Sequence, residues 1–315
     1  MAAPDIRLEL YARPQRLVDI GGRRINVCLS GEGSPTIVLA AGMGGTTIGW
    51  APVQRRLSET NTVLSYDRAG LGFSDPGGRP STTQNIVEDL RAVLKALGLA
   101  PPYILAGHSA GSFDVRLFAF QHPEEVTGMV LADPSSEYQV ERFAQITPRG
   151  TALHEAALAR YRRCEQWAAA ANPVPGSAEY AECVPPPDRN LPDSVNEAMR
   201  AWRLSPVFWR TLHSLDFSFS DGDSREQLKS AGRKLGAMPL VVLTAGKMAW
   251  GSPSEEEATR LHAAWRQMHD ELAALSSRGV RREVAAGHGI PVERPDIVAD
   301  AIREVIALAQ AGASA

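Results

Sequence analysis

Short apolar runs alternate with helical patterns along most of this chain, and this alternation limits the folds open to it. Each run has the length of a strand, and near-continuous apolar character is typical of strands covered on both faces. Strands that alternate with helices favour a mostly parallel sheet. The predicted buried strands are Thr36–Ala40, Thr62–Tyr66, Tyr103–Ala106, Val126–Ala132, Leu240–Thr244 and Arg281–Ala285.

Two further runs, Arg16–Ile20 and Arg24–Ser30, flank Gly21-Gly22 and predict a hairpin at the start of the sheet. Helical periodicity fills the spaces between the later strands. We therefore expect an α/β fold with helices on both faces of the sheet. The clearest helical segments are Thr82–Leu97, Ser109–Gln121, Glu255–Ser276 and Pro295–Leu308.

One long stretch, residues 134–235, interrupts the alternation. It holds helical patterns rich in Ala, Arg and Trp, with proline-rich breaks such as Val184–Pro187, and contains no convincing strand. Because it lies between two core strands, it is best interpreted as a helical insertion. We expect a core domain made of residues 1–133 and 236–315, with residues 134–235 as a cap.

Charge and hydropathy exclude several kinds of partner. The chain has 315 residues, a net charge of -3 and a pI of about 6.2, so it lacks the basic balance typical of nucleic-acid binding. No apolar run approaches the ~18 residues of a membrane span. The first ten residues lack the apolar region of a signal peptide, so we expect a cytoplasmic location. The oligomeric state is left open.

The three cysteines do not have the spacing of a zinc site, and no metal or cofactor is expected. The glycines of Gly42–Gly45 lack the full spacing of a dinucleotide-binding loop. Cys28 lies in a predicted strand as a small core residue. Cys164 and Cys183 share the inserted region and could form a disulfide, although cytosolic proteins usually keep thiols reduced. The reduced and the disulfide-bonded states of Cys164 and Cys183 both stay open, and so does an exported form of the protein with the disulfide.

The strongest functional signal is Gly107-His108-Ser109-Ala110-Gly111, which has the pattern G-x-S-x-G between a predicted strand and a predicted helix. Such a turn strains the backbone and raises the serine into the crevice beyond the strand ends, where ligands bind in open α/β sheets. We therefore predict Ser109 as a nucleophile. His108 is expected to be structural, with its side chain directed away from Oγ of Ser109.

A nucleophilic serine needs a neutral imidazole within hydrogen-bond reach. His288, in Ala286-Gly287-His288-Gly289-Ile290-Pro291, follows the last predicted strand and is the histidine expected to act as the base. The other candidates fall on helical or inserted segments. They are His122, His154, His213, His262 and His269.

With these motifs, the chain resembles the α/β-hydrolase superfamily over nearly its whole length. Asp67–Ser74 is similar to the family's D-x-R-G-x-G-x-S loop, with Ala69 shifting the glycine spacing by one. Ala41–Gly45 occupies the place of its oxyanion loop, with Ala41 in place of a histidine that normally props that loop. The resemblance implies a serine esterase- or lipase-like enzyme whose oxyanion hole uses the backbone N–H groups of Met43 and Ala110.

The acid of the triad is missing from its usual place. The family carries it after the strand that corresponds to Leu240–Thr244, but Ala245–Gly251 contains no Asp or Glu. Some branches place it after the preceding strand, and there this chain has Asp133. An Asp-Pro turn that merely ends the strand is the alternative. We predict Asp133 as the acid, with Glu255 second and Glu137 a distant third.

A helical cap favours a covered, largely apolar pocket for a small to medium ester, lactone or similar acyl donor. Gly42, Trp50, Trp209 and Trp250 are the predicted substrate-binding residues, although packing in the core explains the tryptophans equally well. We expect hydrolysis through an acyl-enzyme. A lyase, a perhydrolase-like enzyme and a non-catalytic ligand-binding protein remain alternatives, since a fold does not fix a function.

Overall fold

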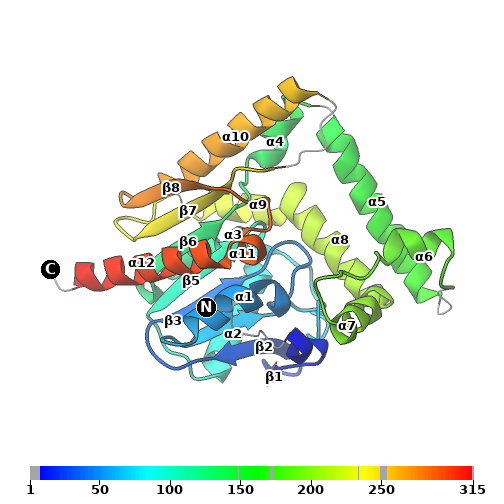
Figure 1. The fold of residues 1–315 in the computed structure, drawn as a ribbon, viewed down its shortest axis with the longest axis horizontal. Helices are drawn as coiled ribbons and strands as arrows, with labels where there is room; N and C mark the ends of the chain where they lie inside the picture. Colours follow the sequence, from blue (N-terminus) through cyan, green and yellow to red (C-terminus); the bar gives the residue numbers. More distant parts are fainter. Residues whose placement is uncertain (1–7, 148, 171–173, 233, 249–253, 314–315) are drawn as a thin grey trace.

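The computed structural model describes residues 8–147, 149–170, 174–232, 234–248 and 254–313, and in this part of the chain one eight-stranded sheet forms (Figure 1). The strand order is β1-β2-β4-β3-β5-β6-β7-β8. Only the β1–β2 and β2–β4 pairs are antiparallel, which confirms the predicted hairpin and the mostly parallel sheet. The strands are β1 (Arg16–Asp19), β2 (Arg24–Ser30), β3 (Thr36–Ala40), β4 (Val63–Tyr66), β5 (Tyr103–His108), β6 (Val126–Ala132), β7 (Leu240–Ala245) and β8 (Gly279–Val284).

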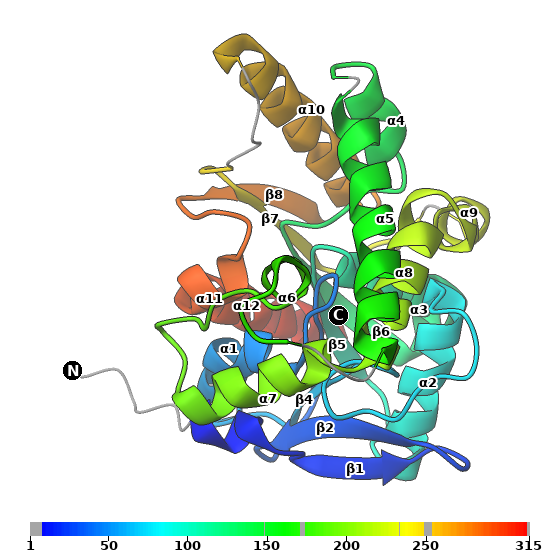
Figure 2. The same ribbon diagram turned by 90° about the vertical axis from the view of Figure 1, so that its right-hand side faces the viewer.

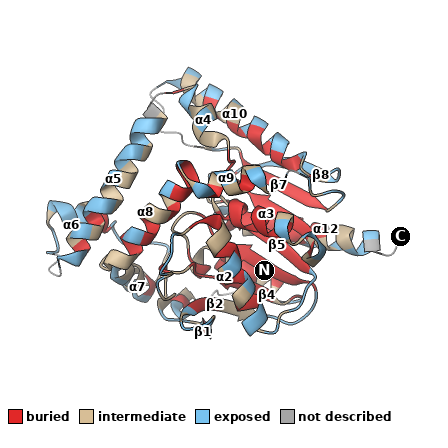
Figure 3. Cartoon of the chain, turned by 180° about the vertical axis from the view of Figure 1, so that it is seen from behind, coloured by how far each residue is buried: buried red, intermediate tan, exposed pale blue. Residues whose placement is uncertain are grey.

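The sheet is covered on both faces, which explains the continuous apolar runs. Along β3, Ile37 and Leu39 belong to one apolar cluster, whereas Val38 and Ala40 belong to the other, and all four are fully buried. Successive side chains of a strand point to opposite faces, so a strand such as β3, which is covered on both, must be apolar at every position. The edge strand β8 differs from the buried strand that the sequence predicts, because Val284 is its one buried residue. Figure 3 shows the central strands of the sheet as continuously buried.

Two layers of helices supply this cover (Figures 1 and 2). The face of Ile37 packs against α1 (Ala51–Leu57) and α12 (Pro295–Ala313). The opposite face packs against α2 (Thr83–Ala96), α3 (Gly111–Gln121) and the end of α10 (Glu255–Ala273). The remaining short helices of the core are η1 (Leu8–Ala12), η2 (Thr47–Trp50), η3 (Pro123–Glu125) and α11 (Ile290–Glu293).

Residues 134–235, where described, form helices and no strand, as the sequence predicts. The helices are α4 (Gln139–Ala144), α5 (Arg149–Ala169), α6 (Ala178–Cys183), α7 (Asp193–Arg203), α8 (Pro206–Ser220) and α9 (Asp223–Ser230). Helices α5 and α8 lie side by side (Figure 1). The last helix, α9, is tied to α2, because the backbone N–H groups of Thr83 and Gln84 donate to the side chains of Ser224 and Gln227, each at 2.9 Å. The division into core and cap stays a prediction.

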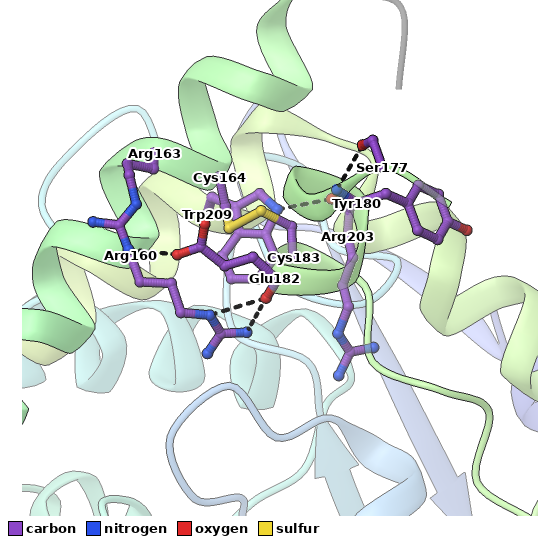
Figure 4. Close-up of a disulfide and its surroundings, with 9 residues drawn as sticks. All are labelled: Arg160, Arg163, Cys164, Ser177, Tyr180, Glu182, Cys183, Arg203 and Trp209. Atoms are coloured by element: carbon purple, nitrogen blue, oxygen red, sulfur yellow. Dashed lines mark hydrogen bonds and ion pairs between the residues drawn. A yellow bond between two sulfur atoms is a disulfide. The ribbon is translucent and has the colours of Figure 1, made fainter. Parts of the chain in front are cut away.

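A disulfide between Cys164 and Cys183 joins α5 to α6 (Figure 4). Both cysteines are buried. Beside them, the guanidinium group of Arg160 donates to the backbone carbonyl oxygen of Glu182 at 2.9 and 3.1 Å and lies over the ring of Trp209. Of the two states that the sequence leaves open, the structure has the disulfide. Disulfides are typical of oxidising compartments, so the cytoplasmic location stays a prediction.

No helix of the described residues combines the length and the apolar character needed to cross a membrane. The predicted lack of a membrane span agrees with this finding.

Replacing both bridged cysteines by alanine is expected to lower the free energy of unfolding. The bridge closes a loop with a sequence separation of 19, and the chain-entropy model gives about 3 kcal/mol for a loop of this length. Denaturant unfolding of the double variant measures the change. Cys28→Ala, which removes the free cysteine, is the control. Equal unfolding midpoints for the double variant and the wild type would contradict the prediction.

Candidate active site

Ser109 stands at the tip of a sharp turn between β5 and α3, with a positive φ of 51°. The turn needs glycine on both sides. A Cβ atom at Gly111 would lie 2.4 Å from the carbonyl oxygen of Ala40, and one at Gly107 would lie 2.7 Å from that of Gly111. Both distances are too short for a side chain, so the two glycines of G-x-S-x-G are required by close backbone approach.

Three residues predicted from the sequence come together at the carboxyl ends of β5, β6 and β8. The Nε2 atom of His288 lies 2.9 Å from Oγ of Ser109. Its other ring nitrogen, Nδ1, lies 2.6 Å from Oδ2 of Asp133. This is the hydrogen-bonded arrangement of a nucleophile, a base and an orienting acid.

The carboxylate of Asp133 is fully buried but well hydrogen-bonded. Its Oδ1 accepts from the backbone N–H of Ala245 and from Nε1 of Trp265, both at 2.9 Å. Burial alone would raise the pKa of Asp133, but the hydrogen bonds from His288, Ala245 and Trp265 outweigh it and hold that pKa below its ordinary value. Asp133 also has a positive φ of 44°, and backbone strain of this kind is concentrated at functional sites.

Helix α10 supplies two residues that sequence reasoning missed. Trp265 binds the carboxylate of Asp133, and His269, one turn later, lies with Nε2 2.8 Å from the carbonyl oxygen of Pro134. A carbonyl oxygen only accepts, so Nε2 carries the hydrogen, and Nδ1 accepts from Oγ1 of Thr244 at 2.8 Å. Burial lowers the pKa of His269 to about 4. The i, i+4 spacing of the two aromatic side chains was their only sequence signal.

The two alternative acids lie elsewhere. Glu255 is the exposed first residue of α10. Glu137 is buried and forms an ion pair with Arg116, at 2.7 Å between Oε2 and Nη1. The structure thus brings Asp133 to His288, and neither of these two hydrogen-bonds to that ring.

The loop Ala41–Gly45 passes beside Ser109 and is held by Arg68. Within the described chain, the backbone N–H groups of Met43 and Ala110 donate to no acceptor, and both residues line a cavity together with Ser109. The guanidinium group of Arg68 donates to the carbonyl oxygens of Gly42 at 2.9 Å and Ala41 at 2.5 Å. It also pairs with buried Asp114. Arg68 therefore supports the loop from which the usual histidine is missing.

His108 packs against the loop of the base. Its Nε2 lies 2.8 Å from the backbone carbonyl oxygen of His288, and the two rings have centroids 4.9 Å apart. Since the carbonyl oxygen accepts, Nε2 carries the hydrogen. Burial, with the nearby His288 ring, lowers the pKa of His108 to about 4. The neutral ring positions the backbone of His288, which fits the structural role expected of His108.

Two cavities meet at Ser109. The first, of about 390 Å³, lies between the Ala41–Gly45 loop and α11, and we name it the loop cavity. It is lined by Gly42, Trp50, His108, His288 and Pro291, among others. The second, of about 340 Å³, lies beneath α4, α5 and α8, and we name it the cap cavity. Both include Ser109 and Met43, so a bound molecule can extend to either side of the serine.

Some of the predicted substrate-binding residues line these cavities and others do not. Gly42 and Trp50 line the loop cavity, where a Cβ at Gly42 would lie 3.2 Å from Cβ of Ser109. Trp209 lines neither cavity. It is buried against Phe208 and Tyr161, and its Nε1 donates to the carbonyl oxygen of Arg203 at 2.7 Å. Trp250 lies outside the described residues.

Other hollows and clusters lie away from Ser109. A cavity of about 860 Å³ opens between α6 and α7 and shares no lining residue with the other two. Among the described residues, His122, Glu124 and Glu125 form the one group spaced closely enough to hold a metal ion. They follow the far end of α3, roughly 16 Å along that helix from Ser109, and Glu125 forms an ion pair with Arg91.

A family model described as alpha/beta hydrolase fold matches residues 35–247. The chain belongs to this family. The predicted superfamily, fold class and kind of enzyme agree with that membership. The same family is indicated by the sequence motifs Gly107–Gly111 and Asp67–Ser74 and by the segment around His288.

Individual relatives cover this chain to different extents. A probable transporter of Hormonema carpetanum, efuK, is 34% identical over 135 residues, and the match covers 40% of this chain but only 19% of that protein. The Bacillus subtilis protein YqjL is 25% identical over 276 residues, covering 87% of this chain and 85% of YqjL. Among solved structures, the enol-lactonase of Burkholderia xenovorans LB400 is 20% identical with a TM-score of 0.59, covering 93% of this chain and 100% of the lactonase.

Arg68→Lys is expected to slow the reaction of Ser109 with a fluorophosphonate by roughly 10- to 100-fold. Loss of an oxyanion donor costs about 100- to 1000-fold in rate, whereas this substitution would only displace the N–H group of Met43. One ammonium group cannot replace the contacts of Arg68 with Ala41, Gly42 and Asp114. The labelling rate measures the effect. Arg24→Lys, which alters an exposed ion pair with Asp75, is the control, and equal rates in all three proteins would refute the supporting role of Arg68.

His269→Gln is expected to weaken the dependence of stability on pH between about 6.5 and 4. The pKa of His269 is depressed in the folded protein from 6.5 to about 4, so the unfolded chain binds more protons there and wild-type stability falls as the pH falls. The contribution of this one group is about 2–3 kcal/mol. Urea unfolding at several pH values gives the slope for each protein. His122→Gln is the control, and an unchanged slope in His269→Gln would count against the buried neutral ring.

Proposed function

We propose that this protein is a serine hydrolase that cleaves an ester, lactone or related acyl bond through an acyl-enzyme on Ser109. The observation that carries this proposal is the unbroken series of contacts from Oγ of Ser109 to His288, at 2.9 Å, and from His288 to Asp133, at 2.6 Å. Such a series activates an otherwise weak hydroxyl nucleophile. The buried, ionised Asp133 is suited to orient His288 and to stabilise its protonated form.

In the first half of the reaction, Oγ of Ser109 attacks the carbonyl carbon of the substrate while Nε2 of His288 takes the hydroxyl proton. Met43 and Ala110 line the same cavity as Ser109, and their backbone N–H groups would hold the developing negative oxygen. Ala110 directly precedes α3, whose N-terminal dipole adds to this stabilisation. Collapse of the tetrahedral intermediate breaks the bond to the leaving group, which receives the proton from His288.

In the second half, water attacks the acyl-enzyme and His288 takes its proton. The bond between the acyl carbon and Oγ of Ser109 breaks, and His288 returns the proton to the serine. The balance is substrate plus water giving a carboxylic acid and an alcohol, or a hydroxy acid when the substrate is a lactone.

The two cavities indicate how the substrate lies. His288 must reach the leaving group to protonate it, and His288 lines the loop cavity. The leaving group therefore belongs in the loop cavity, with Gly42 and Trp50, and the acyl part in the cap cavity. Each volume lies near the lower end of the range for small-molecule sites, in keeping with a small to medium substrate. The similarity to an enol-lactonase supports a substrate of this chemical class.

The nucleophile is tested with a panel of p-nitrophenyl esters and a fluorophosphonate probe. The wild type is expected to turn over at least one ester and to be labelled, whereas Ser109→Ala does neither. Ser277→Ala, which alters an exposed serine after α10, is the matched control and keeps both. A wild type that binds an ester without cleaving it and resists the probe would favour a ligand-binding protein on this fold.

The acid is tested with Asp133→Asn, which keeps the shape but cannot hold the right tautomer of His288. Its kcat is expected to fall by about 10⁴-fold. The control is Asp300→Asn, at an exposed position of α12. If Asp133→Asn stays near full activity while Glu255→Gln loses it, the acid is Glu255.

A further inference from the structure

The cap cavity combines an apolar wall with one charged region. Besides Ser109, its lining includes the apolar residues Met43, Val140, Phe143 and Phe219. Three ionisable side chains from the cap line the same cavity: His154 of α5, Asp216 of α8 and Asp221 at the end of α8. We name these three the His–Asp cluster. Apolar walls with a few placed polar groups are typical of sites that fix the orientation of a ligand.

The His–Asp cluster is organised by its own contacts. The imidazole of His154 bridges the two carboxylates, with Nε2 3.0 Å from Oδ2 of Asp221 and Nδ1 3.4 Å from Oδ1 of Asp216. Asp216 also accepts from Oγ of Ser220 at 3.2 Å. The side chains of His154 and Asp216 are 19% and 14% exposed, whereas that of Asp221 is 45% exposed. Two of the three are therefore held in place, and Asp221 remains accessible.

The charge of the His–Asp cluster is negative in either state of its histidine, since two carboxylates face one imidazole. No Lys or Arg is among the described residues that line the cap cavity. Burial raises the pKa of Asp216 above its ordinary value despite the nearby His154. This is expected of a carboxylate whose lost hydration is only partly replaced by hydrogen bonds and nearby positive charge. Among its described lining residues, the cavity that would receive the acyl part thus has two carboxylates and no Lys or Arg.

We propose that the cap cavity selects acyl donors whose acyl chain carries a cationic group, bound by Asp216 and Asp221 beyond a short apolar segment. The apolar wall contacts the carbon chain next to the scissile carbonyl, and the carboxylates contact the cation. This inference rests on the proposed hydrolase function and names the substrate class of that site. The chemistry is that given above: ester plus water yields an alcohol and a carboxylic acid that bears the cation.

The test uses pairs of p-nitrophenyl esters of equal shape. One member has a trimethylammonium group at the end of the acyl chain, and the other has a tert-butyl group in the same place. The pairs are 4-(trimethylammonio)butanoate with 5,5-dimethylhexanoate, and 6-(trimethylammonio)hexanoate with 7,7-dimethyloctanoate, so that chain length is not assumed. The ratio of kcat/KM for the cationic ester to that for its neutral partner measures charge selection alone.

The wild type is expected to prefer the cationic member of at least one pair by roughly tenfold, the size expected of one charge–charge contact at a partly exposed site. Asp221→Asn is expected to lose most of that preference, because the KM of the cationic ester rises. Asp221 is the primary variant because its exposure makes misfolding less of a concern than at Asp216. Asp223→Asn, an exposed acid two residues along the chain that lines neither cavity at Ser109, is the matched control and keeps the ratio. If the cluster only braces the cap, Asp221→Asn lowers both esters alike and the ratio stays constant.

Failure of this inference is distinguishable from failure of the hydrolase function. Turnover of neutral esters and labelling of Ser109 without a cationic preference would overturn the cationic substrate class alone. If no ester is cleaved, equilibrium binding of 6-(trimethylammonio)hexanoate and 7,7-dimethyloctanoate by calorimetry still decides. Tighter binding of the cation that is lost in Asp221→Asn would support the charged subsite, and equal or absent binding would overturn it.

Discussion

A Cβ atom at Gly111 would lie 2.4 and 2.5 Å from the carbonyl oxygens of Ala40 and Ala41, and this close approach is the constraint on which the candidate site depends. It brings the start of α3 against the end of β3. The same contact sets Ser109 at the tip of its turn, puts the N–H of Ala110 at the head of α3, and starts the Ala41–Gly45 loop beside both. The candidate nucleophile and the candidate oxyanion donors are therefore positioned by backbone packing, not by flexible side chains, which is the preorganisation that such sites need.

The candidate acid depends on a second set of contacts, made by the end of β7, by α10 and by His288. A buried carboxylate is costly unless hydrogen bonds replace its lost hydration. Asp133 receives three donors: a ring nitrogen of His288, an indole N–H from α10 and the amide of Ala245. That amide belongs to the strand end after which the family usually carries its acid. The segment that carries no acidic residue in this chain thus contributes a backbone N–H donor to the carboxylate of Asp133, at the end of the neighbouring strand.

The sequence predicted the parts of the molecule that depend on local pattern. Strands buried on two faces read as apolar runs, and Ser109 and His288 stand in short motifs fixed by turn geometry. Asp133 was predicted from the family resemblance, because some branches carry the acid after the preceding strand and Ala245–Gly251 contains no Asp or Glu. The remaining features depend on long-range packing. Arg68 binds a loop 26 residues earlier in the chain. Trp209 packs against other residues of the 134–235 segment, although its spacing was equally compatible with a place in the pocket. Helices α5 and α8 are separated by about 60 residues in the sequence, so no local pattern predicted that His154 lies beside Asp216 and Asp221.

The position of the His–Asp cluster relative to Ser109 follows from the packing of α8 on the core. Phe219 of α8 lies 4.5 Å, between ring centroids, from Phe113 of α3, the helix that begins directly after the serine turn. Asp216 and Asp221 flank Phe219 within about one helical turn on either side. Their spacing from the serine is thus set where α8 is anchored, whereas the disulfide secures the far end of α5. A substrate chain would have to match a fixed distance between the oxyanion loop and the carboxylates, so the length of the chain matters as much as its charge.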